Sequence, residues 1–296
     1  MCNGTAKPFL KWAGGKGQLL NTFDKLFPEK LKIGKIDTYI EPFVGGGAVL
    51  FYLLQNYDIK QAYINDINKE LINCYRCIKA DVFEVIKKLE ILEKEYSGLE
   101  KEIYYKVRDR YNDINLNGKY DFEKCADFIF LNRTCFNGLY RVNKNGKFNV
   151  PQGKYKKPLI CDRDNLILCS KLLQKVQISF GEYQQVLNNV TENTFIYFDP
   201  PYRPIVENNS FVSYDKSVFD DTCQKELAEY YKMLSQKECL LMLSNSDPKN
   251  TNEDDTFFDN LYNGYRIERV TAKRMINCVA SKRSDITEIL VMNYSK

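Results

Sequence analysis

A short apolar, aromatic-rich run that ends in an acid and two prolines most strongly limits what this chain can fold into. Residues 194–198 read Thr-Phe-Ile-Tyr-Phe, which is typical of a buried strand. Asp199, Pro200, Pro201 and Tyr202 follow directly. Because proline cannot continue a hydrogen-bonded ladder, the strand ends at Asp199. Open α/β sheets bind their ligands at this carboxyl edge of the strands.

The four residues after this strand suit a planar amino group as their ligand. The Asp199 carboxylate and the Pro200 carbonyl are two fixed hydrogen-bond acceptors, and Tyr202 offers an aromatic face. A planar amine could donate both of its N–H groups to these acceptors while its ring stacks on the tyrosine.

A second set of residues has the pattern of a nucleotide-binding unit. Residues 35–40 are typical of a strand, 41–47 of a glycine-rich turn and 48–55 of a helix. The next strand, at 62–64, is followed by Asp66, and an acid at this place usually accepts from ribose hydroxyls. The alternative is that Asp66 serves only to form the turn after this strand. The order of glycine turn and acid favours a ribose ligand, without the G-x-G-x-x-G pattern of dinucleotide binding.

The rest of the chain predicts a doubly wound sheet with one large insertion. Strand patterns at 176–180, 239–243, 265–272 and 287–293 alternate with helical ones. Residues 67–128 instead repeat apolar side chains at helical spacing, so we expect them to form a helical insertion.

A glycine-rich loop near the N-terminus is open to two interpretations. Trp12, the only tryptophan of the chain, precedes Gly14, Gly15 and Lys16, and a helical pattern follows at 19–27. Such a loop lets a ligand approach the backbone at the start of a helix. A simple connecting loop is the alternative.

A basic segment predicts contact with a polyanion. Residues 129–160 contain seven basic residues and no acidic residue, and their Asn-Gly pairs predict a hairpin. The aromatic residues Phe136, Phe148 and Tyr155 lie among the basic ones, which fits phosphate contacts combined with base stacking. A lysine-rich hairpin is more often a solvated loop, but a solvated loop has little need of these aromatic residues.

The composition excludes several kinds of chemistry. The chain has no histidine, which rules out Ser-His and Cys-His nucleophiles. Cys74 and Cys77 form a lone C-x-x-C, so we expect no metal. The ten cysteines show no disulfide framework, and neither a signal peptide nor a transmembrane run is present. We therefore expect a cytoplasmic protein.

Five ordered blocks together resemble the Dam-type DNA adenine-N6 methyltransferases of the D12 class. They are F-L-K-W-A-G-G-K at 9–16, E-P-F-V-G-G-G at 41–47, N-D at 65–66, N-R-x-x-F-N-G-L-x-R-x-N-x-x-G-x-F-N-V-P-x-G at 132–153 and D-P-P-Y at 199–202. The resemblance spans nearly the whole chain and is closest to restriction–modification members that methylate GATC. The tetrad alone is less specific, because enzymes acting on RNA and protein amides carry similar ones.

The resemblance implies an α/β fold: a Rossmann-like methyltransferase sheet with an inserted, mostly helical DNA-recognition domain that carries a β-hairpin. The expected S-adenosylmethionine-binding catalytic domain comprises residues 1–66 and 161–296. The expected target-recognition domain comprises residues 67–160, with its hairpin at 132–157. The implied methyl donor is S-adenosyl-L-methionine, and the implied partner is double-stranded DNA. A cognate restriction endonuclease is compatible with this class, whereas no stable protein partner and no membrane are required.

The same resemblance assigns roles to single residues. The implied catalytic residues are Asp199, Pro200 and Tyr202. The implied donor-binding residues are Trp12, Lys16, Glu41, Phe43, Gly45, Asp66 on the ribose hydroxyls, and Asp199 between donor and target. The implied DNA contacts are a wedge into the duplex at Phe136, thymine contacts at Leu139 and Pro151, guanine contacts at Arg141 and Lys11, and backbone or vacated-base contacts at Asn137 and Asn143. The wedge departs from the usual Tyr, which keeps the stacking and loses a hydroxyl.

The physical chemistry of the tetrad agrees with this reading. The amine of adenine lies inside the duplex, so the base must flip out at a cost on the order of a few kcal/mol. Acceptors at Asp199 and Pro200 favour the pyramidal nitrogen that attacks a methyl group. The predicted function is methylation of adenine N6 within GATC. The alternatives are an N-methyltransferase acting on RNA or a protein amide, which should lack the hairpin block, and a silent DNA-binding module, which would not need an intact tetrad.

Overall fold

The computed structural model describes residues 4–118, 120–203, 219–272 and 286–295. The chain divides into two compact units. Unit 1 comprises residues 1–17, 44–57 and 63–185, and unit 2 comprises residues 18–43, 58–62 and 186–296. The boundaries of a catalytic and a recognition domain stay a prediction. Two further segments of the sequence, a basic stretch at 273–283 that we expect to be a loop and the run from 204 to 214 after the tetrad, lie outside the described residues.

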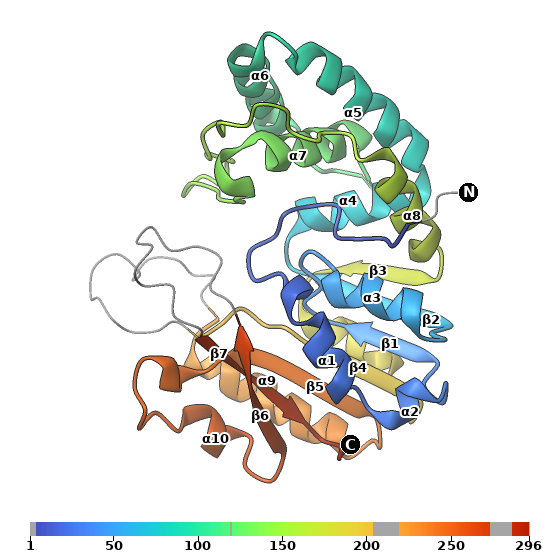
Figure 1. The fold of residues 1–296 in the computed structure, drawn as a ribbon, viewed down its shortest axis with the longest axis vertical. Helices are drawn as coiled ribbons and strands as arrows, with labels where there is room; N and C mark the ends of the chain where they lie inside the picture. The colour runs from blue at the N-terminus through green and yellow to red at the C-terminus, as the bar shows by residue number, and fades with distance from the viewer. Residues whose placement is uncertain (1–3, 119, 204–218, 273–285, 296) are drawn as a thin grey trace. The chain divides into compact units, whose positions relative to one another are not determined.

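The described strands form one sheet in the order β3-β2-β1-β4-β5-β7-β6 (Figure 1). Their bounds are β1 Thr38–Glu41, β2 Gln61–Asp66, β3 Val176–Phe180, β4 Thr194–Phe198, β5 Leu240–Ser246, β6 Arg266–Ala272 and β7 Ile286–Met292. β4 is parallel to both β1 and β5, whereas β7 is antiparallel to β5 and β6. This arrangement confirms the predicted Rossmann-like α/β sheet.

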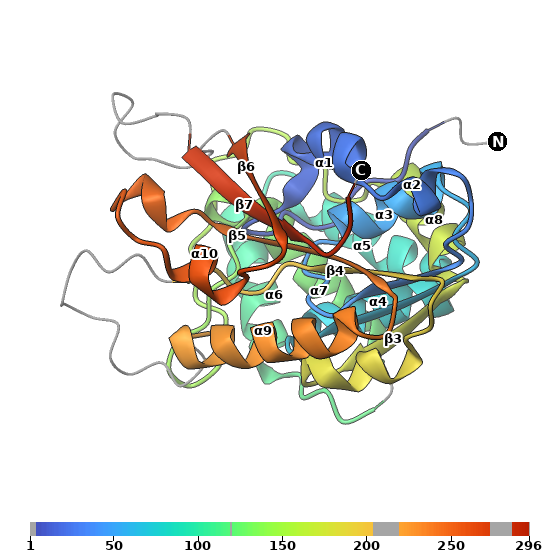
Figure 2. The same ribbon diagram turned by 90° about the horizontal axis from the view of Figure 1, so that it is seen from below.

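Helices of unit 2 cover both faces of β4. The described helices of unit 2 are α1 Leu20–Leu26, α2 Glu29–Lys32, α9 Asp221–Ser235 and α10 Phe257–Leu261, with a 3-10 turn η4 Pro248–Asn250; α1 and α9 are the two that pack on β4. Tyr197 of β4 packs edge-on against Phe23 of α1, and Phe198 packs against Tyr231 of α9. Figure 2 shows α1 and α9 on opposite sides of the strands. Because successive side chains of β4 alternate between two covered faces, every position of the strand is buried.

Unit 1 is mostly helical. Its helices are α3 Ala48–Asn56, α4 Lys69–Ala80, α5 Val82–Tyr96, α6 Glu100–Asp113, α7 Phe122–Thr134 and α8 Arg163–Leu173, with a 3-10 turn at η2 Phe136–Gly138. The 3-10 turns η1 Lys16–Gln18 and η3 Tyr183–Asn189 begin in unit 1 and end in unit 2. The central helix is α7, which contacts α4, α5 and α6 and is buried along most of its length. Asp121 caps its start by accepting from Lys124 N. Sequence reasoning did not predict α8.

In the structure, the predicted hairpin at 132–157 is a turn whose two arms are joined by isolated β-bridges. Asn143 N donates to Lys147 O, and Gly146, at a φ of 72°, closes the turn. Val142 and Phe148 form one isolated antiparallel bridge. The segment therefore reverses direction as predicted, but without two continuous strands.

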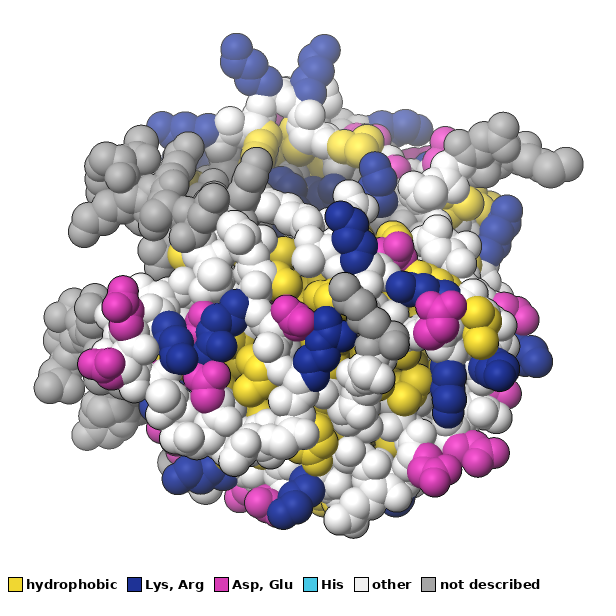
Figure 3. Space-filling model, turned by 60° about the horizontal axis from the view of Figure 1, so that its bottom comes forward, with side chains coloured by type: hydrophobic (Ala, Val, Ile, Leu, Met, Phe, Trp, Pro, Cys, Tyr) yellow, Lys and Arg dark blue, Asp and Glu magenta, His cyan; other side chains and the backbone are white. Residues whose placement is uncertain are grey.

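Charge is mixed on the face of the molecule drawn in Figure 3. Among the described side chains there, basic and acidic groups lie interspersed, with apolar groups between them. Within the described part of the chain, no helix combines the length and the apolar character that crossing a membrane requires.

Candidate functional site

Two acidic side chains lie where the strand order of the sheet reverses. The order passes from β1 directly to β4, and in this parallel pair Ile40 lies opposite Ile196. Glu41 is the last residue of β1, and Asp199 follows the last residue of β4. Doubly wound sheets bind ligands outside the carboxyl ends of the strands at this switch point. The predicted residue Asp199 therefore lies where this fold holds its ligand.

Asp199 is held by a directed chain of hydroxyl groups. Ser244 Oγ donates to Asp199 Oδ1 at 2.9 Å, and Tyr197 Oη lies 2.7 Å from Ser244 Oγ. A serine hydroxyl carries one hydrogen, so Tyr197 must be the donor to Ser244. Burial and the nearby Asp199 charge raise the pKa of Tyr197 well above its usual value. The phenol therefore keeps the hydrogen that this chain requires.

Tyr202 is held at its hydroxyl end by the antiparallel part of the sheet. Its O–H donates to Glu288 Oε2 at 2.6 Å, and Glu288 belongs to β7. Burial and the charges of Asp199 and Glu288 raise the pKa of Tyr202. The ring that the sequence offers as a stacking face is thus fixed at its far end.

Glu41 and Phe43, both predicted to bind the donor, lie at the end of β1. Glu41 is 2% exposed and accepts at Oε2 from the Tyr39 hydroxyl at 2.9 Å. Burial, followed by the charge of Glu41, raises the pKa of Tyr39. Phe43 is half-buried and packs edge-on against Phe219, with ring centroids 5.8 Å apart.

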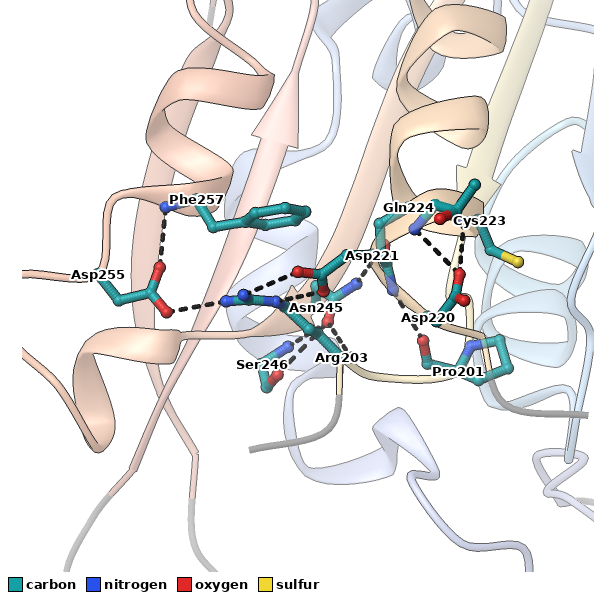
Figure 4. Close-up of polar contacts among 11 residues, drawn as sticks. Pro201, Arg203, Asp220, Asp221, Cys223, Gln224, Asn245, Ser246, Asp255 and Phe257 are labelled. Carbon is teal, nitrogen blue, oxygen red and sulfur yellow. Dashed lines mark hydrogen bonds and ion pairs between the residues drawn. The ribbon is translucent and has the colours of Figure 1, made fainter. Parts of the chain in front are cut away.

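Two buried amide side chains hold the backbone on either side of Tyr202 (Figure 4). Gln224 Nε2 donates to Pro201 O at 3.1 Å, and Arg203 N donates to Asn245 Oδ1 at 3.3 Å. The two amides also bond to each other, because Asn245 Nδ2 donates to Gln224 Oε1 at 3.2 Å. Both side chains are fully buried, so this frame is protected from water.

Arg203 anchors the chain where it leaves the tetrad (Figure 4). Its guanidinium forms a two-pronged bond with Asp221, at 2.6 and 3.0 Å, and a third bond with Asp255 at 2.8 Å. It also lies 4.1 Å from the centre of the Phe257 ring. The hydrogen bonds to Asp221 raise the pKa of Arg203. Planar, bidentate contacts of this kind are a property of arginine that lysine cannot reproduce.

In unit 1 the glycine turn is joined to the predicted ribose acceptor. Gly45 N donates to Asp66 Oδ2 at 3.0 Å, and Asn68 N donates to Asp66 Oδ1 at 2.9 Å. Gly45 and Gly47 have φ angles of 47° and 73°, which favour glycine. Burial raises the pKa of Asp66, and the backbone N–H groups oppose this shift.

Trp12 packs on the glycine turn and also on Tyr140, which lies in the predicted target-recognition domain. A Cβ at Gly45 would lie 3.0 Å from Trp12 Cδ1, and the indole stacks on Tyr140 with ring centroids 5.5 Å apart. The nearby Lys16 is 4% exposed, and its ammonium donates to Gly14 O at 2.8 Å. The sequence did not single out Tyr140, whose position next to Trp12 depends on tertiary packing.

The structure brings four predicted DNA contacts together: Phe136, Asn137, Leu139 and Pro151. Phe136 N donates to Pro151 O at 2.9 Å, and Leu139 N donates to Phe136 O at 3.2 Å. The Phe136 side chain is 50% exposed, unlike most of the aromatic residues that the structure describes. Asn137 next to it has a φ of 56°, a left-handed conformation that asparagine tolerates. An exposed aromatic ring on a tight turn is available for stacking on bases.

Lys11 joins this group through a residue that sequence reasoning missed. Lys11 N donates to the side-chain oxygen Oδ1 of the buried Asn132 at 2.7 Å, and Asn132 Nδ2 donates to Lys11 O and Gly138 O. The Lys11 ammonium lies 4.5 Å from the centre of the Tyr155 ring. A buried asparagine within the apolar run that forms α7 was the signal in the sequence, but it does not name its partner.

The remaining two predicted contacts lie on the turn. Arg141 Nε donates to Asn149 Oδ1 at 2.8 Å, which orients an exposed guanidinium. Asn143 Oδ1 accepts from Asn145 N and Lys147 N, at 2.9 and 3.1 Å. Asn143 therefore shapes the turn, and its predicted contact with DNA stays a prediction.

The sheet with an Asp-Pro-Pro-Tyr tetrad at its switch point defines a Rossmann-like methyltransferase that acts on amino groups. The family described as D12 class N6 adenine-specific DNA methyltransferase matches residues 12–276, and the chain belongs to this family. The predicted family, enzyme class and adenine-specific DNA methyltransferase function are thereby confirmed.

Named relatives match the chain over nearly its full length. The chain is 52% identical over 293 residues to the Type II methyltransferase M.MjaIII of Methanocaldococcus jannaschii, covering 97% of this chain and 99% of the relative. It is 37% identical over 290 residues to the Type II methyltransferase M1.LlaDCHI of Lactococcus lactis subsp. cremoris, covering 97% and 95%. It is 32% identical over 287 residues to a DNA adenine methylase of Haemophilus influenzae, covering 97% and 93%.

Proposed function

We propose that this chain transfers a methyl group from S-adenosylmethionine to N6 of an adenine flipped out of duplex DNA, within the sequence GATC. The observation that carries the proposal is the Asp199 carboxylate, which Ser244 holds at the carboxyl end of β4. Family membership supports the adenine, and the hairpin block that resembles GATC-specific members supports the sequence around it.

In this proposal the tetrad prepares the target nitrogen. The Asp199 carboxylate and the Pro200 carbonyl accept the two N–H bonds of the amine, which frees its lone pair from the ring. Tyr202 stacks on the flipped base. When bound, S-adenosylmethionine supplies a methyl group already activated by its sulfonium. The protein's part is therefore positioning and electrostatics, with no covalent nucleophile and no metal required.

The residues assigned to the donor fit that group. A carboxylate can accept about four hydrogen bonds, so the two backbone N–H groups on Asp66 leave capacity for ribose hydroxyls. The left-handed turn at Gly45 lies directly against Trp12, because a Cβ at this glycine would come within 3.0 Å of the indole. We assign the ribose to Asp66 and further donor contacts to Trp12, Lys16, Glu41, Phe43 and Gly45.

The segment around η2 is the proposed reader of the duplex. Phe136 enters the base stack, because its ring is exposed on a turn fixed by the Pro151 carbonyl. Leu139 and Pro151 contact the thymine methyl, and Arg141 and Lys11 contact guanines. Asn137 and Asn143 contact the backbone or the space that the flipped base leaves.

The first experiment measures methyl transfer to DNA. Purified protein, tritiated S-adenosylmethionine and short duplexes should yield N6-methyladenine in GATC and little in duplexes with the same bases in another order. Asp199→Ala should lower the rate at least about 100-fold, because it removes an acceptor at the reacting nitrogen. Asp58→Ala, which removes an exposed acid, is the matched control and should keep the wild-type rate.

Two results would contradict the proposal. One is full activity in Asp199→Ala. The other is methylation of RNA or of a protein amide while duplex DNA stays unmodified, which would favour the alternative substrate classes.

We further propose that the chain serves a restriction–modification system with a cognate endonuclease, in cytoplasm that contains the nucleoid. The Type II names of two relatives and the free thiols of the described cysteines support this setting. Plasmid DNA from cells that express only this protein should resist an endonuclease blocked by adenine methylation at GATC. An endonuclease that ignores this methylation is the control and should still cut.

A further inference from the structure

The end of β5 contacts the tetrad at two separate points. Ser244 donates to the Asp199 carboxylate, while Asn245 accepts from Arg203 N and donates to Gln224, which holds the Pro201 carbonyl. Neighbouring side chains of a strand point to opposite faces of the sheet. The Ser244 side chain bonds on the face that α1 covers, where Tyr197 lies, and the Asn245 side chain bonds to α9 on the other face.

We infer that the Ser244-Asn245 dipeptide positions the tetrad for methyl transfer. Ser244 fixes the rotamer of Asp199, and Asn245, with Gln224, fixes the peptide groups before and after Tyr202. The inference rests on the proposed role of Asp199 as acceptor for the target amine. Neither residue of the dipeptide touches the base in this scheme, so both are positioning residues.

The hydrogen count gives Ser244 its specific role. Its single hydrogen goes to Asp199, and its oxygen accepts from Tyr197. An alanine at this position would leave a fully buried Tyr197 hydroxyl without the serine oxygen and would release one constraint on the carboxylate. Because the carboxylate must meet an N–H group in one orientation, we expect the effect to appear in the chemical step.

Single-turnover transfer of tritiated methyl groups to a GATC duplex, with saturating donor, tests Ser244. Ser244→Ala should lower the rate about 10- to 100-fold, whereas the dissociation constant for the duplex should change less than about twofold. Ser244→Thr keeps the hydroxyl and should restore most of the rate. Tyr197→Phe, which removes only the donor to Ser244, should lower the rate by a smaller factor.

Tyr231→Phe is the matched control for Tyr197→Phe. Tyr231 is equally buried in unit 2, and its hydroxyl donates to Leu241 O and Val291 O rather than toward the tetrad. Its variant should keep the wild-type transfer rate. A wild-type rate in Ser244→Ala, a failure of Ser244→Thr to restore it, or equal rate reductions in the two Tyr→Phe variants overturns the inference.

Asn245 is tested in the same assay. Asn245→Ala should lower the single-turnover rate about tenfold, and Gln224→Met, which has a similar shape, should do the same if the alanine variant fails to fold. A wild-type rate in a folded variant of either residue overturns the role of the frame. A wild-type protein that puts no methyl group on adenine N6 would instead contradict the proposed function itself, so the two failures are distinguishable.

Discussion

At the scale of single residues, tyrosine hydroxyl groups orient three acidic side chains of unit 2 through hydrogen bonds. Tyr39 donates to Glu41, Tyr202 donates to Glu288, and Tyr197 reaches Asp199 through Ser244. Burial raises the pKa of each phenol, so all three stay protonated as donors. With no histidine in the chain, the orientation of these carboxylates depends on groups that do not titrate near neutral pH.

A prediction at this scale concerns how guanine is read. Arg141→Ala should reduce discrimination against duplexes with the contacted guanine replaced, by about 1–3 kcal/mol or roughly 5- to 150-fold. In the proposed contact, Arg141, which Asn149 orients, offers two donors to guanine O6 and N7. Transfer rates on matched and substituted duplexes measure it.

Lys144→Ala is the control for the removal of a positive charge on the same turn. Lys144 is exposed, and its variant should weaken binding to all duplexes about equally, as a phosphate contact does. If Arg141→Ala lowers activity on all duplexes by one common factor, Arg141 does not read a base.

At the scale of elements, an ion pair joins α6 to α7 in unit 1. Arg110 Nε donates to Asp127 Oδ2 at 2.9 Å, and the Asp127 side chain is fully buried. Burial raises the pKa of Asp127 to about 6, and Arg110 only partly opposes this shift. A carboxyl group with a raised pKa binds its proton more tightly in the folded state, so its contribution to stability is greatest in acid.

The expected pH dependence follows from that shift. As the pH rises from about 4 to about 6, the unfolding free energy of the wild type should fall relative to Asp127→Asn by about 1–3 kcal/mol. Above this range the difference should stay constant. Urea unfolding at several pH values measures it, with Asp109→Asn on the exposed side of α6 as the charge control. A difference that does not change between pH 4 and 6 contradicts the raised pKa.

At the scale of the whole molecule, the excess of positive charge is concentrated in one segment of the sequence. The chain has a net charge of +4, and residues 101–160 carry 13 basic against 6 acidic residues. Affinity for the duplex should therefore depend on lysines of this segment rather than on the total charge.

Replacing three exposed lysines with glutamine tests this expectation; they are Lys154, Lys156 and Lys157. The slope of log affinity against log salt should become shallower by about 0.9 for each of these lysines that binds a phosphate in the wild type. The control replaces three other exposed lysines with glutamine. Lys225 and Lys232 lie in α9, and Lys237 follows that helix. Equal changes of slope in both triple variants would show that only net charge matters.

The local patterns were predictable, and the tetrad is the clearest case. The β4 strand and its end at Asp199 follow from an apolar run and two prolines that adjoin in sequence. The glycine turn, Asp66 and the exposed Phe136 were found in the same way. For the hairpin at 132–157, the reversal of chain direction was predicted, but the two arms form isolated β-bridges instead of continuous strands.

The sequence by itself determined the sheet class, the family and the place of the acid at a strand end, because runs of residue types and tight turns are local properties. Only the tertiary structure decided which groups hold that acid. Ser244, Asn245 and Glu288 reach the tetrad through the pairing of β5 with β4 and β7. Asn132 reaches Lys11 across 121 positions of sequence. Such contacts depend on strand order and register, which no short stretch of residues specifies.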